Sequence, residues 1–226
     1  MKKEDLVKYF DHTNATKPVS TRDDIKKTCE EARGYGFASV CVNSHFVKFV
    51  KECLSGSKVE VCSVIGFPMG MNVTEVKVFE TKKAIKDGAD EIDMVINIGE
   101  MKGGNYKFVE EDIREVVKAA KGRVVKVIIE CCYLTDEEKR RACILAKKAG
   151  AHFVKTSTTM GKPADGRFNG ATVEDVRLMK KAFGGDVKAA GGISTLKDAL
   201  AFIEAGATRL GASRSVSIVE ELEEEK

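Results

Sequence analysis

Hydrophobic positions along the chain follow two alternating patterns. Short runs rich in β-branched residues, such as VVKVII at 124–129, are apolar almost throughout, which is typical of parallel strands buried on both faces. Longer stretches between them place apolar residues three or four positions apart, which predicts amphipathic helices. The predicted strands are Asp11–Thr13, Ala38–Val42, Val59–Ile65, Glu91–Ile96, Val124–Ile129, His152–Thr156, Val187–Ala190 and Arg209–Ala212. The predicted helices are Thr21–Tyr35, His45–Leu54, Thr74–Asp87, Lys107–Lys121, Thr135–Ala149, Thr172–Phe183 and Thr195–Ala205.

The ends of several helices are marked by characteristic residues. Threonine stands at the start of three of them, where its side-chain oxygen accepts a free backbone N–H. Glycine follows three of them, where a left-handed backbone is needed. Each glycine also opens a repeat of Gly-Ala, two residues and a strand (GADEIDMV, GAHFVKTS and GATRLGAS), which indicates a reused βα unit. The threonines are Thr21, Thr135 and Thr195, and the glycines are Gly88, Gly150 and Gly206.

Eight such units predict a (β/α)₈ barrel formed by residues 1–226 as one domain. The chain of 226 residues allows about 28 residues per unit, close to the usual size of this fold. A doubly wound open sheet is the alternative, because the alternation is common to both folds. We expect a short helix before the first strand. The stretch Glu220–Lys226 holds five glutamates and is interpreted as a solvated or frayed helix end.

Composition narrows the class of protein. The net charge of +3 is too small to favour a nucleic-acid or membrane-surface partner, and no apolar run is long enough for a membrane span. The seven cysteines follow no metal-binding spacing, so we expect reduced thiols, a cytoplasmic protein and no metal site.

Four successive predicted strands each carry one ionisable residue among apolar neighbours. They are Asp93, Lys126, Lys155 and Lys188. Buried lysines are rare unless paired, so one charged residue on each of four successive strands suggests a shared polar centre inside the barrel. A structural ion-pair network is the simpler interpretation. Three lysines against one aspartate leave excess positive charge, which lowers ammonium pKa values and favours an amine nucleophile that forms Schiff bases.

Glycine-rich segments follow the last strands. Small residues near the start of a helix leave backbone N–H groups accessible, and these groups can bind an anion. In (β/α)₈ enzymes, phosphate often binds in the loops after strands seven and eight. The candidate phosphate-binding residues are Gly191, Gly192, Ser194, Gly211, Ser213 and Arg214.

From Asp11 to Val219 the sequence resembles the deoxyribose-phosphate aldolases, which are Schiff-base-forming class I aldolases on a (β/α)₈ barrel. The segments that carry the resemblance are VCSVIGFPMG with TEVKVFET, GADEIDMVINIG, VVKVIIECCYL, FVKTST and VKAAGGI. The implied reaction is reversible cleavage of 2-deoxy-D-ribose 5-phosphate to D-glyceraldehyde 3-phosphate and acetaldehyde, in the breakdown of deoxyribonucleotides. The resemblance implies a homodimer and no metal or organic cofactor, because the iminium itself accepts the electrons.

The resemblance also implies roles for individual residues. Lys155 matches the lysine that forms the Schiff base, Lys188 the second lysine that lowers its pKa, and Asp93 the aspartate that transfers protons. The implied substrate-pocket residues are Asp11, Thr13, Lys126 and Thr156.

The phosphate loops depart from the family pattern. The segment Thr159–Asn169 is longer than usual, with Thr159 where glycine is typical. Ser194 replaces an arginine, and we expect Arg214 to substitute for it in space; a solvent-facing Arg214 is the alternative. Two other functions stay open: a different Schiff-base aldolase for a related phosphorylated sugar, and a non-catalytic phosphosugar-binding barrel.

Overall fold

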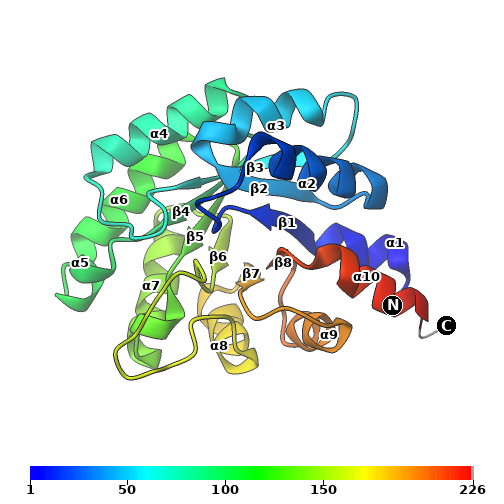
Figure 1. Cartoon of the computed structure of the whole chain (residues 1–226). Coiled ribbons are helices and arrows are strands. Elements are labelled where there is room, and N and C mark those ends of the chain that lie inside the picture. Colours follow the sequence, from blue (N-terminus) through cyan, green and yellow to red (C-terminus); the bar gives the residue numbers. More distant parts are fainter. Residues whose placement is uncertain (225–226) are drawn as a thin grey trace.

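Eight parallel strands form a closed barrel at the centre of the molecule (Figure 1). The computed structural model describes residues 1–224. Each strand pairs with the next along the chain, and β8 pairs with β1. The predicted barrel is therefore confirmed, and the open sheet is excluded. The strands are β1 (Phe10–Asn14), β2 (Ser39–Asn43), β3 (Glu60–Ile65), β4 (Glu91–Val95), β5 (Val124–Ile128), β6 (Phe153–Lys155), β7 (Asp186–Ala190) and β8 (Arg209–Ala212).

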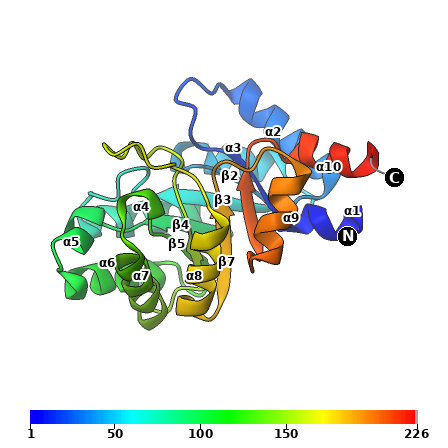
Figure 2. The same ribbon diagram turned by 90° about the horizontal axis from the view of Figure 1, so that it is seen from below.

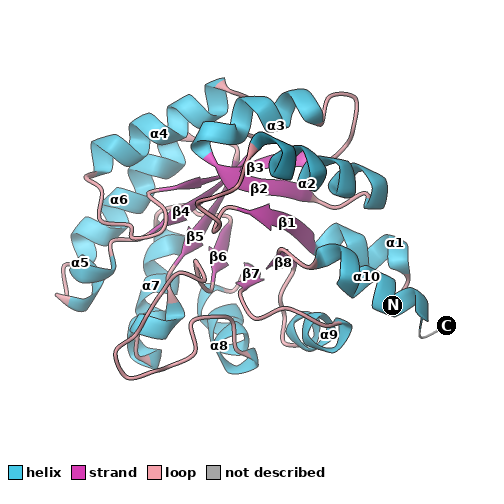
Figure 3. Cartoon of the chain, viewed as in Figure 1, coloured by secondary structure: helices cyan, strands magenta, loops and turns pink. Residues whose placement is uncertain are grey.

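Helices surround the barrel on the outside, as Figure 3 shows. All seven predicted helices are present, although the second begins as a 3₁₀ turn at Ser44–Phe46. Three helices were not among those seven: α1 before the first strand, α5, and α10 at the end of the chain. The helices are α1 (Lys3–Leu6), α2 (Arg22–Tyr35), α3 (Val47–Cys53), α4 (Thr74–Lys86), α5 (Ile98–Lys102), α6 (Tyr106–Ala119), α7 (Asp136–Lys148), α8 (Val173–Phe183), α9 (Leu196–Glu204) and α10 (Ser215–Glu224).

The predicted helix ends are confirmed in atomic detail. The side chains of Thr21, Thr135 and Thr195 accept the N–H three residues on, and an acid at that position reaches back to the threonine N–H. The three repeat glycines follow their helices with φ values of 110°, 87° and 108°. The threonines therefore mark where loops at the carboxyl end of the strands stop, and the glycines mark where loops at the opposite end of the barrel begin.

The acidic end of the chain belongs to the last helix. Residues up to Glu224 belong to α10, which packs beside α1, and Leu222 is only 8% exposed. Glu221 accepts the N–H of Leu196 at the start of α9 (2.6 Å). The prediction of a solvated helix end is therefore confirmed for Glu220, Glu223 and Glu224, which are exposed, while Glu225 and Lys226 lie outside the described residues.

The strands divide their side chains between two environments. On β5, Val125 and Val127 point outward into the apolar layer beneath the helices, while Lys126 between them points into the barrel. In Figure 2 the loops after β1 and β6 rise on the same side of the barrel, the carboxyl end of the strands. Within residues 1–224, no helix has the length and apolar character needed to cross a membrane.

Candidate active site

The ionisable residues of the interior strands meet at one carboxylate. Asp93 on β4 accepts hydrogen bonds from Lys126 on β5 (2.9 Å), Lys155 on β6 (2.8 Å) and Lys188 on β7 (2.8 Å). The register explains this convergence, because Asp93 lies beside Lys126, and Lys155 lies beside Lys188. The shared polar centre predicted from the sequence is confirmed.

Three further charged residues belong to this centre. Asp11 on β1 pairs with Lys188 and Arg209, and lies 3.5 Å from the Lys126 amine. Glu91 on β4 accepts from Lys126 at 2.5 Å and from Arg209 at 3.2 Å. Four cations therefore meet three carboxylates. The expected excess of positive charge, three lysines against one aspartate, therefore falls from two to one, because Asp11 and Glu91 add two carboxylates and Arg209 adds one cation.

The pairing changes the pKa values in this centre. Burial alone lowers the pKa of a lysine, but Asp11 and Asp93 outweigh it and raise the pKa of Lys188. The pKa of Lys126 is raised in the same way. Burial opposes ionisation of Asp93, yet the three lysines hold its pKa well below the usual value. The expectation that crowding lowers the pKa of these ammonium groups is thus corrected for Lys126 and Lys188.

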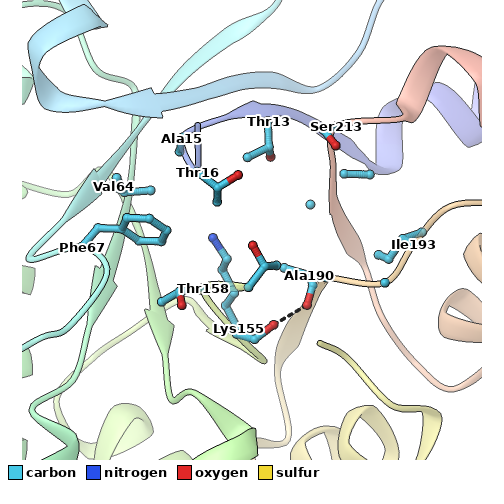
Figure 4. A pocket seen from close by; sticks show the side chains of 16 residues that line it. Thr13, Ala15, Thr16, Val64, Phe67, Lys155, Thr158, Ala190, Ile193 and Ser213 are labelled. Carbon is cyan, nitrogen blue, oxygen red and sulfur yellow. Dashed lines mark hydrogen bonds between the residues drawn. The ribbon is translucent and has the colours of Figure 1, made fainter. Parts of the chain in front are cut away.

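One of the three interior lysines reaches a pocket. Lys155, 4% exposed, lines the cavity at the carboxyl end of the strands, and Figure 4 shows its amine pointing into the space between Thr16, Phe67 and Thr158. Lys126 and Lys188 are fully buried beneath it, as is Asp93. The site therefore presents one primary amine to a small molecule, with a charged layer directly below.

The other predicted pocket residues divide between the lining and the layer below. Thr13 lines the pocket, whereas Asp11 is fully buried under it. Thr156 is also buried, and its hydroxyl donates to the Ala190 carbonyl (3.1 Å). Thr156 therefore joins β6 to β7 and does not form part of the pocket wall.

Part of the predicted phosphate site faces the same pocket. Gly191, Gly192, Gly211 and Ser213 line it. Gly191 and Gly192 have φ values of 90° and 77°, which only glycine adopts readily. The backbone after β7 therefore turns without side chains that would fill the pocket.

Two predicted phosphate residues lie elsewhere. Ser194 donates to Asp198 near the start of α9 (3.1 Å), and Arg214 is exposed, outside the pocket lining. The exposed Arg214 side chain agrees with the solvent-facing alternative, and its substitution for the arginine absent at position 194 stays a prediction. The Arg214 carbonyl accepts the Ile218 N–H (3.1 Å) where the chain enters α10.

Sequence reasoning missed several lining residues. Phe67, Ser157 and Thr158 line the pocket, as does Thr159 at the start of the long segment Thr159–Asn169. On that segment, the Phe168 ring packs over Gly192 so closely that a Cβ there would come within 2.6 Å of it. For Thr158, its place three residues after Lys155 was the available signal, whereas Phe67 lies in the loop after β3, far from Lys155 in the sequence.

Thiol and carboxylate atoms also gather inside the barrel. Ligand atoms of Cys41, Cys62 and Asp93 lie within 4.8 Å of one another. Both Asp93 oxygens already accept from lysine amines, so a metal ion there would face positive charge. This donor set suits ammonium groups better than a metal.

Fold and site together define a class of protein: a (β/α)₈-barrel enzyme whose pocket holds one amine beside glycine-rich turns. Comparison with known proteins agrees. Residues 6–216 match the family described as DeoC/LacD family aldolase. The chain belongs to this family and is an aldolase.

Individual relatives are similar over nearly their whole length. A deoxyribose-phosphate aldolase of Aciduliprofundum boonei is 60% identical over 97% of each chain, and one of Streptococcus sanguinis is 57% identical over 95% of each. The solved structure of the aldolase QR15 is 40% identical, with a TM-score of 0.90 over 97% of this chain and 96% of that one. A deoxyribose phosphate aldolase from Aeropyrum pernix, described as tetrameric, is 30% identical with a TM-score of 0.90 over 100% and 94%.

Proposed function

We propose that this chain reversibly cleaves 2-deoxy-D-ribose 5-phosphate to D-glyceraldehyde 3-phosphate and acetaldehyde through a Schiff base on Lys155. The observation that carries the proposal is the placement of the three interior lysines. Lys155 lines the pocket, while Lys126 and Lys188 are fully buried below it. The relatives named above as deoxyribose-phosphate aldolases support the choice of substrate.

The chemistry follows from this placement. Neutral Lys155 attacks the C1 aldehyde of the open-chain sugar, and loss of water leaves an iminium. The iminium withdraws electrons from the C2–C3 bond. As that bond breaks, Asp93 takes the proton of the C3 hydroxyl through a water, and glyceraldehyde 3-phosphate leaves. The remaining enamine is protonated at C2, and water then releases acetaldehyde and restores the amine.

The buried layer supports Asp93 in this role. Lys188 and Lys155 both donate to the same Asp93 oxygen, at 2.8 Å each. A proton gained or lost at one of these groups therefore changes the charge felt by the others. We assign Lys188 to tuning the protonation of Lys155 through Asp93, and Lys126 and Asp11 to balancing charge.

The phosphate of the substrate needs a site at the far end of the pocket. The backbone of Gly191, Gly192 and Gly211, with Ser213, is the proposed site. Thr13 faces the space between this region and Lys155, where it can hydrogen-bond a sugar hydroxyl. Binding of the phosphate orients the reacting end of the sugar.

The proposal is tested by trapping the Schiff base. The protein is incubated with acetaldehyde and borohydride, and peptides are mapped by mass spectrometry. We expect one ethyl group on Lys155, and none in Lys155→Met. Lys162→Met is the matched control, because Lys162 is an exposed lysine on the neighbouring loop, and its variant keeps the adduct.

The outcomes separate the candidate functions. A single adduct on Lys155 with cleavage of deoxyribose phosphate supports the proposal. An adduct without that cleavage points to a different phosphorylated sugar. Adducts scattered over surface lysines, or none, contradict Schiff-base chemistry and leave a phosphosugar-binding barrel.

We also propose that two copies of the chain associate through an apolar patch formed by Met69, Met71, Val73, Val76 and Phe79. These side chains lie within eleven residues and are all exposed, Phe79 at 71%. A patch of this kind on a folded protein indicates a protein contact. In sedimentation we expect a dimer that Phe79→Asp converts to monomer. Leu200→Asp, on α9, is the control, and a monomeric wild-type chain contradicts the proposal.

We assign the protein to the cytoplasm, in the breakdown of deoxyribonucleotides. All seven cysteines are free thiols. Six of them are buried or nearly so among side chains of the barrel and its helices. A reducing compartment keeps such thiols in this state.

A further inference from the structure

Glu130 is a buried acid that lies outside the charged centre. It follows β5 and is only 1% exposed. Its backbone has φ 53° and ψ 68°, a left-handed conformation that costs a residue with a side chain about 1 kcal/mol or more. Surrounding contacts must hold a residue in such a conformation, so the partners of the Glu130 side chain are informative.

Those partners belong almost entirely to one residue, Thr158. The Thr158 N–H donates to both Glu130 oxygens (3.1 and 3.2 Å), and the Thr158 hydroxyl donates to one of them. The Cys132 thiol adds a contact at 4.0 Å. Within residues 1–224, no lysine or arginine lies within ion-pair distance of this carboxylate. A buried carboxylate is costly without hydrogen bonds, so this geometry ties Glu130 firmly to Thr158.

Thr158 is part of the pocket wall beside Lys155. It lies three residues after Lys155, and Figure 4 shows both facing the same space. Its hydroxyl also accepts the Met160 N–H (3.0 Å). Thr159, between them, has φ 67° without being glycine. The turn that follows Lys155 is therefore strained, and its hydrogen bonds converge on Glu130 through Thr158.

We propose that Glu130 is a positioning residue of the aldolase reaction. Its carboxylate holds Thr158, and with it the pocket wall that faces the substrate bound to Lys155. The inference rests on the proposed function above. A covalently attached substrate still has to align its C2–C3 bond and C3 hydroxyl, and a wall displaced by about 1 Å costs about 100-fold in rate.

The test compares Glu130→Ala with Glu130→Gln and measures kcat, KM and the yield of trapped Schiff base on Lys155. We expect kcat to fall about 10- to 100-fold in Glu130→Ala. Glu130→Gln keeps one acceptor for the Thr158 N–H and restores part of the rate. The Schiff-base yield stays at the wild-type value, because Lys155 itself is unchanged. Glu137→Gln is the control for loss of one negative charge, since Glu137 is 74% exposed on α7.

A second variant keeps the test decisive if Glu130→Ala does not fold. Thr158→Val preserves shape and the backbone N–H but removes the hydroxyl, and we expect kcat to fall several-fold. If the two residues act as one unit, the double variant with Glu130→Gln has a kcat only slightly below that of Thr158→Val alone. Wild-type kcat in the Glu130 and Thr158 variants overturns the inference. The inference is also overturned if kcat falls only in proportion to the yield of Schiff base on Lys155. A wild-type protein that forms no Schiff base refutes the proposed function instead.

Discussion

At the scale of single residues, Asp93 is the point on which the site depends. It is fully buried and accepts hydrogen bonds from three lysines on three different strands. A hydrophobic interior tolerates such a charge only when it is fully paired. In the proposed reaction protons move beside this same carboxylate, so the stability of the site and the proposed reactivity rely on one side chain.

Asp93→Asn tests the charge of Asp93 separately from the size of its side chain. The amide keeps the size of the side chain but leaves three ammonium groups without a shared anion. We expect turnover to fall by about 10²- to 10⁴-fold, the usual contribution of an acid–base group. The unfolding free energy falls by about 3–5 kcal/mol in urea titrations. Asp23→Asn, an exposed acid in the first turn of α2, is the control. Turnover equal to wild type contradicts the assigned role.

Glu60 gives a pH-dependent prediction at the opposite end of the barrel. Glu60 is exposed at the start of β3, and the partial desolvation of its carboxyl, with the neighbouring charge of Glu91, raises the pKa of Glu60 to about 7. The folded state therefore holds this proton more tightly than the unfolded state, and its stabilising effect is lost as pH rises from about 4.5 to 7. Glu60→Gln keeps a neutral side chain throughout. We expect its Tm to equal wild type at pH 4 and to exceed it by about 1–3 °C at pH 8. A difference in Tm between Glu60→Gln and wild type that is the same at pH 4 and pH 8 contradicts the raised pKa of Glu60.

At the scale of elements, a buried ion pair fastens α4 to α6 and to the barrel. The Lys77 amine donates to Asp112 on α6 (2.6 Å) and to the Val95 carbonyl at the end of β4 (3.0 Å). Thr74 donates to the other Asp112 oxygen (2.9 Å). Both charged side chains are fully buried. This contact holds α4 behind the loop that carries Phe67 to the pocket.

Lys77→Met tests that contact. Removing the amine leaves the Asp112 charge and the Val95 carbonyl without their partner, so we expect a loss of about 3–5 kcal/mol in urea unfolding. Lys77→Met combined with Asp112→Leu removes both charges and recovers most of this loss. Lys82→Met, an exposed lysine on the same helix, has little effect. A double variant as unstable as the single one contradicts the ion-pair explanation.

The sequence predicted elements well where the signal is local. The eight strands and the capped helices follow from apolar runs, threonine caps and glycines that lie close together in the chain. The exposed glutamates of α10 were predicted, but the buried Leu222 and the Glu221 contact were not, because their partners come from elements distant in sequence. In the site, Lys155 and Asp93 could be identified from the sequence, because each is a charged residue within an apolar strand. Arg209 lies at the start of a strand, where a solvent-exposed charge is common. Its contacts inside the barrel could not be predicted locally, because they form only when the barrel closes.

At the scale of the whole molecule, the charged centre joins the two ends of the chain. Arg209 on β8 donates to Asp11 on β1 (2.6 Å), and to both oxygens of Glu91 on β4 (3.2 Å each). Asp11 and Arg209 are 198 positions apart. Such contacts form only when the barrel closes, because they require strands from the beginning, middle and end of the chain.

Arg209→Met therefore probes closure of the barrel. It leaves Asp11 and Glu91 with less positive charge, and the buried carboxylates then repel each other. We expect the unfolding free energy to fall by about 3–5 kcal/mol in a single cooperative transition. Arg209→Lys keeps the charge but cannot make the bidentate contact with Glu91, so it recovers part of the lost unfolding free energy. Arg177→Met, an exposed arginine on α8, stays near wild type. If Arg209→Met leaves urea unfolding unchanged, the charges beneath the pocket do not hold the barrel shut. In that case apolar packing between strands and helices supplies the closure alone.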